Sequence, residues 1–64
     1  SLAQAKKHFN RVVETSPTYI IAYYYRGVVL EMEGNIAGAR KDYQTALNFN
    51  PEFARAQEAL ARLK

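Results

Sequence analysis

The apolar residues of this chain recur every three or four positions along most of its length. One stripe consists of Leu2, Ala5, Phe9, Val12 and Val13, and a second consists of Ile36, Ala39, Tyr43, Ala46 and Leu47. This spacing places each set on one side of an α-helix. No segment alternates with a period of two, so the pattern predicts an all-α fold.

The segment 17–33 differs because it is apolar on two adjacent faces. One face carries Ile20, Tyr23, Gly27 and Leu30, and the other carries Ile21, Tyr24, Val28 and Met32. A helix of this kind buries both faces or offers one of them to a partner.

Turn and cap residues divide the chain. Ser16-Pro17 and Asn50-Pro51 each join an N-cap residue to a proline, which is tolerated at the first helical position. Gly34-Asn35 reads as a helix stop followed by a new N-cap. The sequence therefore predicts four helices, over about 2–15, 17–33, 36–48 and 51–63.

Residues of the same kind also recur along the chain at a constant separation, which is the separation between Ala5 and Ala39. The matching pairs are Ala5/Ala39, Lys7/Lys41, Phe9/Tyr43, Pro17/Pro51, Tyr19/Phe53 and Ala22/Ala56. Most of them are small, aromatic or proline residues, which fix how helices approach and turn.

One repeat contains the following residues, given in chain order: Tyr23, Arg26, Gly27, Leu30, Ala39, Tyr43, Ala46 and Pro51. This order resembles the tetratricopeptide repeat family over one complete unit, about residues 20–53. The resemblance implies an α-solenoid of antiparallel helix–turn–helix units, in which these residues are structural. It divides the single domain 1–64 into the second helix of a preceding repeat (1–16), a complete hairpin (17–50) and the first or capping helix of a following repeat (51–64).

Two residues depart from the usual family pattern. Arg26 stands where leucine is common, and a guanidinium at a helix interface requires a partner. A sub-pattern of this family is similar, with arginine before the glycine and aspartate before the aromatic residue of the second helix. This resemblance implies that Arg26 pairs with Asp42, on the other helix of the hairpin. Gln57 replaces an aromatic residue in the last helix, which therefore resembles a polar capping helix.

Composition adds little about location. The chain has 48% hydrophobic and 23% charged residues, a net charge of +3 and no cysteine, so disorder and disulfide or thiolate sites are not expected. No apolar stretch is long enough to span a bilayer, and no signal peptide is present in this sequence. These features favour a cytoplasmic location.

Catalytic groups do not converge anywhere in the sequence. His8 is the one histidine and is expected to be a solvated surface residue. Glu31 and Glu33 lie two positions apart on a helix, so they diverge and cannot share a proton or a metal ion. We expect a protein that is not an enzyme and needs no cofactor or metal.

The family resemblance implies that the first helices of successive repeats line a concave groove that binds a peptide or a partner helix. The expected groove residues are Ile21, Tyr24, Val28, Met32, Arg55 and Arg62. A clamp for a C-terminal carboxylate is not expected, because Val28 and Glu58 stand where that variety has asparagine and lysine. The alternative is that Tyr24 and Met32 pack on a further helix upstream.

Two other functions stay open. The chain holds the equivalent of two repeats, whereas repeat arrays typically need about three. One alternative is therefore a self-associating domain, in which two copies could exchange helices. Lys6-Lys7 and Arg40-Lys41 occupy equivalent positions in successive repeats and would form a basic strip on the second helices. No aromatic residues are interleaved with these basic pairs for base stacking, so nucleic-acid binding is the less favoured interpretation.

Overall fold

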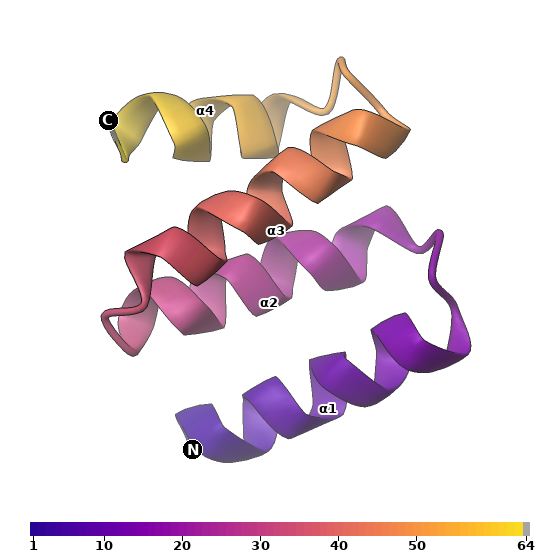
Figure 1. The fold of residues 1–64 in the computed structure, drawn as a ribbon, viewed down its shortest axis with the longest axis vertical. Coiled ribbons are helices and arrows are strands. Elements are labelled where there is room, and N and C mark those ends of the chain that lie inside the picture. The colour runs from indigo at the N-terminus through magenta and orange to yellow at the C-terminus, as the bar shows by residue number, and fades with distance from the viewer. Residues whose placement is uncertain (64) are drawn as a thin grey trace.

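The structure is a computed structural model that describes residues 1–63, in which four helices follow one another in a zigzag (Figure 1). They are α1 (Leu2–Thr15), α2 (Ile20–Met32), α3 (Ile36–Phe49) and α4 (Ala54–Arg62). No strand occurs in this described part, and the all-α prediction is confirmed. Helices α1 and α4 lie at opposite ends of the long axis, and the α1–α2 and α3–α4 connections lie on the same side (Figure 1).

The connection between α2 and α3 matches the prediction from Gly34-Asn35. Gly34 has φ +86°, and the N–H groups of Gly34 and Asn35 donate to the carbonyls of Glu31 and Leu30, each at 2.9 Å. This is the bonding of a Schellman motif, which ends a helix at a residue with left-handed geometry. The Asn35 side chain then accepts a hydrogen bond from the Gly38 N–H at 2.9 Å and caps α3.

The two prolines lie in turns before α2 and α4 rather than inside these helices. The helices begin at residues 20 and 54, whereas the sequence predicted 17 and 51. Ser16 and Asn50, which were predicted as N-caps, are instead the C-caps of α1 and α3. Their N–H groups donate to the carbonyls of Val12 and Ala46. The predicted helix starts at Pro17 and Pro51 are therefore wrong.

The reason is that the chain must reverse direction at these points. The Tyr19 N–H donates to the Ser16 carbonyl at 3.0 Å, and the Phe53 N–H donates to the Asn50 carbonyl at 3.0 Å. Each bond closes a four-residue turn with proline at its second position, a place that proline favours. Tyr19 is extended (φ −81°, ψ 96°), so helical geometry starts only after it.

The core lies around α3, between α2 and α4. Ala39, Tyr43 and Ala46 of α3 are fully buried, and they pack with Ala56 and Ala59 of α4. Small residues at these positions let the helix axes approach closely, and the Tyr43 ring fills the remaining space.

Helix α1 has a different environment from α3, its equivalent one repeat later. Ala5, Phe9 and Val12 of α1 are only half-buried, and no residue of α1 is buried. The reason is that α1 packs mainly against α2, whereas α3 packs against both α2 and α4.

Candidate partner-binding face

One side of α2 is only partly covered by the other helices. Ile21, Tyr25, Val28 and Met32 lie on this side at intervals of four, three and four residues. Met32 is 66% exposed, Tyr25 is 39% exposed, and Ile21 and Val28 are half-buried. We call these four residues the α2 stripe.

Tyr24 lies beside the stripe and contributes to helix packing. Its ring centroid is 5.7 Å from that of Tyr43 on α3 and 5.7 Å from that of Phe53, which it meets edge-on. Tyr24 is half-buried. Tyr24 was predicted to line the groove, and its ring also packs α2 against neighbouring parts of the chain.

The two arginines predicted for the groove reach from α4 back to α2. Arg62 donates from Nη1 and Nη2 to the Glu31 carboxylate, at 2.6 and 3.1 Å. Arg55 Nη1 makes a longer contact of 3.4 Å with the Tyr25 hydroxyl. The structure thus brings Arg55 and Arg62 alongside the α2 stripe, and Arg55 has the weaker partner.

Glu31 is the acceptor for two helices at once. The Tyr43 hydroxyl donates to Glu31 Oε1 at 2.7 Å, in addition to the two bonds from Arg62. The bonds from Arg62, followed by the one from Tyr43, lower the pKa of Glu31 below its usual value. Burial of the phenol, followed by the hydrogen bond to the Glu31 carboxylate, raises the pKa of Tyr43 far above its usual value. Glu31 therefore links α2, α3 and α4 as a carboxylate.

Arg26 and Asp42 meet between α2 and α3, as the sequence predicted. Arg26 Nε and Nη2 donate to the two oxygens of the Asp42 carboxylate, each at 2.8 Å, and Arg26 Nη1 donates to Asn10 Oδ1 of α1 at 3.1 Å. Asp42 is 4% exposed. The hydrogen bond with Asp42 raises the pKa of Arg26. Through its bonds to Asp42 and Asn10, Arg26 joins α1, α2 and α3.

A shallow hollow of about 360 Å³ lies at the edge where the two proline turns meet α2. Its lining is largely apolar and consists of Thr18, Tyr19, Ile20, Ile21, Asn50 and Phe53. Ile21 belongs to both the hollow and the α2 stripe. The hollow therefore extends the stripe toward the turns.

The residues predicted as structural lie inside or beside the hairpin. Gly27, Ala39, Tyr43 and Ala46 are buried, and Tyr23 and Leu30 pack against the same cluster. The Tyr23 hydroxyl donates to the Pro17 carbonyl at 2.6 Å, and at the equivalent position of the next repeat Gln57 Nε2 donates to the Pro51 carbonyl at 2.7 Å. Gln57 thus repeats the hydrogen bond of the aromatic residue that it replaces.

Residues 1–63 contain no group of three His, Cys, Asp or Glu side chains close enough to hold a metal ion. His8 is exposed on α1, as expected. None of the helices in this range has the length and apolarity needed to cross a bilayer.

Tyr25 is the residue of this face that the sequence analysis missed. Its ring stacks on Phe9 of α1, with centroids 6.0 Å apart, while its hydroxyl points to Arg55 of α4. The helical spacing from Ile21 contained the signal, since Tyr25 completes the interval between Ile21 and Val28.

Antiparallel helices that stack at a regular sequence period and leave one apolar stripe open define an all-α repeat protein. A family model described as tetratricopeptide repeat matches residues 20–53, which is more than half of the chain. The chain therefore belongs to the tetratricopeptide repeat family, whose members generally mediate protein–protein interaction and are typically non-enzymatic scaffolds. Comparisons with curated proteins and with solved structures gave no match.

Proposed function

We propose that this chain is a protein-interaction module that binds a peptide or a partner helix along the α2 stripe, between the stripe and the arginines of α4. The carrying observation is the exposure of Met32, at 66%, on a helix whose other sides pack against neighbours. An exposed apolar side of this kind is the usual contact for an apolar segment of a partner.

The residues around the stripe indicate the chemistry of that segment. Ile21 and Val28 offer apolar contact. Among residues 1–63, the hydrogen bond of the Arg55 guanidinium is its long contact with the Tyr25 hydroxyl. Arg62 is already paired with Glu31, so it supplies little free charge. A segment with apolar side chains facing α2 and an acidic residue near Arg55 fits this arrangement. A C-terminal carboxylate clamp is not proposed, because Val28 and Glu58 are unsuited to it.

The test begins with peptides selected on the immobilised chain from a displayed random library. Their affinity is then measured for the native chain and for Met32→Glu, which places a charge on the open side of α2. We expect Met32→Glu to weaken the selected peptides by about ten-fold or more, because an apolar contact would be replaced by a charge that must be desolvated.

Gln44→Glu is the matched control, since it also adds one negative charge but lies exposed on α3. It should leave the affinity within about two-fold of the native value. Equal weakening by the two substitutions, or unchanged binding by Met32→Glu, would show that the α2 stripe is not the contact.

A second candidate function is self-association through α1. Ala5, Phe9 and Val12 are half-buried in α1, whereas their equivalents Ala39, Tyr43 and Ala46 are fully buried because α4 covers them. A helix from a second copy could cover the α1 residues in the same way. Sedimentation over a wide range of concentrations tests this: a mass that rises with concentration supports it, and a monomer throughout contradicts it.

A further inference from the structure

The net charge of this chain is concentrated on two of its four helices. α1 and α3 carry Lys6, Lys7, Arg11, Arg40 and Lys41 against two acidic residues, Glu14 and Asp42. This excess equals the net charge of +3 of the whole sequence, so the acidic and basic residues elsewhere balance. The excess positive charge therefore lies on α1 and α3, the second helices of the two repeats.

The two acidic residues of α1 and α3 neutralise only part of the positive charge on these helices. Asp42 is buried, and both of its oxygens accept hydrogen bonds from Arg26 of α2. On α1 and α3 this leaves Glu14 as the exposed carboxylate, near the last turn of α1. Lys6 is paired with Glu33 at 3.0 Å, whereas Lys7, Arg11 and Lys41 are exposed.

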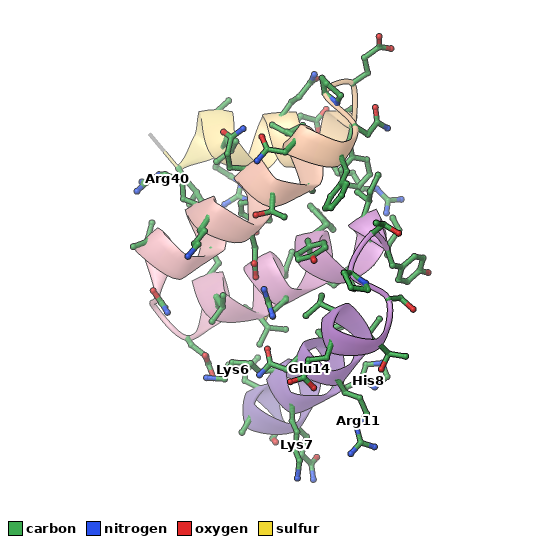
Figure 2. All side chains as sticks on the ribbon, turned by 45° about the vertical axis from the view of Figure 1, so that its right-hand side comes forward. Lys6, Lys7, His8, Arg11, Glu14 and Arg40 are labelled. Carbon is green, nitrogen blue, oxygen red and sulfur yellow. The ribbon has the colours of Figure 1, made fainter. Side chains whose placement is uncertain are left out.

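The repeat places these cations in register. Lys7 and Lys41 occupy equivalent positions in successive repeats. Lys7 lies two residues after the half-buried Ala5 and Lys41 two residues after the buried Ala39, which turns each lysine to the opposite side of its helix. Figure 2 shows Lys7 and Arg11 projecting from α1 away from the other helices. Arg40 projects from α3, where one of its nitrogens donates to the Leu63 carbonyl at 3.1 Å (Figure 2). We call Lys7, Arg11, Arg40 and Lys41 the basic face.

Two shallow hollows, of about 470 and 490 Å³, accompany these cations on α1 and α3. In the described part of the chain, no carboxylate lines either hollow. Their lining residues are Gln4, Lys7, His8 and Arg11 on α1, and Ala37, Arg40, Lys41, Gln44, Thr45 and Asn48 on α3.

The groups in these hollows suit carboxylates better than nucleic-acid bases. Ammonium, guanidinium and amide N–H groups are donors for carboxylate oxygens. Among residues 1–63, His8 is the one aromatic residue that lines either hollow, so unpaired bases would have no phenylalanine or tyrosine ring to stack on. The arrangement favours a protein partner over single-stranded nucleic acid.

We propose that the basic face binds an acidic segment of a partner protein, rich in aspartate and glutamate. This contact lies on α1 and α3, apart from the α2 stripe. It does not depend on the proposed peptide groove, and an acidic partner can be bound while the α2 stripe is occupied.

The test measures fluorescence anisotropy of a labelled poly-glutamate peptide at low salt, with the native chain, Lys41→Glu and the double variant Ala54→Glu/Ala61→Glu. Lys41→Glu and the double variant lower the net charge by the same amount, but Ala54 and Ala61 are exposed on α4 and belong to neither the α2 stripe nor the basic face. We expect Lys41→Glu to raise Kd by about five-fold or more and the double variant to raise it by less than about two-fold. Binding should also weaken as salt is added.

Three results would overturn the proposal. The first is no measurable binding of poly-glutamate by the native chain. The second is equal weakening by Lys41→Glu and by Ala54→Glu/Ala61→Glu, which would mean that net charge alone is responsible. The third is tighter binding of a single-stranded RNA or a DNA duplex than of the peptide at the same salt, which would assign the basic face to nucleic acid.

Discussion

Gly27 is a residue at which the packing of α2 on α3 leaves no room for a side chain. A Cβ atom there would lie 2.7 Å from Cε1 of the fully buried Tyr43 ring. We predict that Gly27→Ala lowers the free energy of unfolding by about 1–3 kcal/mol, because the ring or the helix must shift. Urea denaturation of the two proteins measures this difference.

A double-mutant cycle identifies the cause. Tyr43→Leu removes the ring atoms that the new methyl group would meet, so Gly27→Ala should cost less in that background than in the native chain. An equal cost in both backgrounds would mean that the Tyr43 ring is not what excludes a side chain at position 27.

The Arg26–Asp42 pair is a second case in which single residues decide stability. Asp42→Ala would leave a guanidinium that is 23% exposed without its carboxylate. We predict a loss of about 2–4 kcal/mol in the free energy of unfolding, somewhat below the cost for a fully buried pair because Arg26 keeps some contact with water. Lys6→Ala, which breaks the exposed Lys6–Glu33 pair, should cost less than about 1 kcal/mol. Similar costs for both substitutions would contradict a structural role for Asp42.

At the scale of elements, Glu31 makes the attachment of α4 to α2 dependent on pH. The bonds from Arg62 lower the pKa of Glu31 in the folded chain. Its contribution to stability is therefore present above its unperturbed pKa of 4.5 and is lost as the pH falls through the lowered value. We predict that Glu31→Gln is less stable than the native chain at neutral pH and that the difference narrows below pH 4.5.

Chemical denaturation of the two proteins at a series of pH values tests this, because Glu31→Gln removes one carboxyl group and leaves the others in place. A difference that stays constant between neutral pH and about pH 3 would contradict the role of the Glu31 charge.

The helices themselves could be predicted from the sequence, but the start of two of them could not. Apolar spacing and the Gly34-Asn35 pair were sufficient for α1, the end of α2 and the start of α3. Ser16-Pro17 and Asn50-Pro51 are compatible with both a helix start and a turn, since proline has the same φ in each. The choice depends on the direction of the following helix, which is a tertiary property.

The candidate site was predictable in part for a similar reason. Helical spacing identified Ile21, Val28 and Met32, because the residues of one face can be read from a single helix. The bonds from Arg62 to Glu31 could not be predicted. These residues are 31 positions apart, and their approach depends on how α4 packs beside α2.

At the scale of the whole molecule, the repeat separates two kinds of surface. The first helices carry the apolar α2 stripe, and the second helices carry the basic face. Each side chain returns to the same side after one full repeat, so further repeats with the same pattern would extend both surfaces in parallel. These are the separate faces on which we propose that an apolar and an acidic partner segment bind.

The most direct test of the central claim, that the open side of α2 binds the partner, is an NMR map of amide shifts. The native chain would be titrated with a peptide selected on it. The largest changes should fall on residues 21–32 of α2 and on Arg55 and Arg62 of α4. Changes confined to the outer sides of α1 and α3, with the α2 amides unmoved, would contradict the claim.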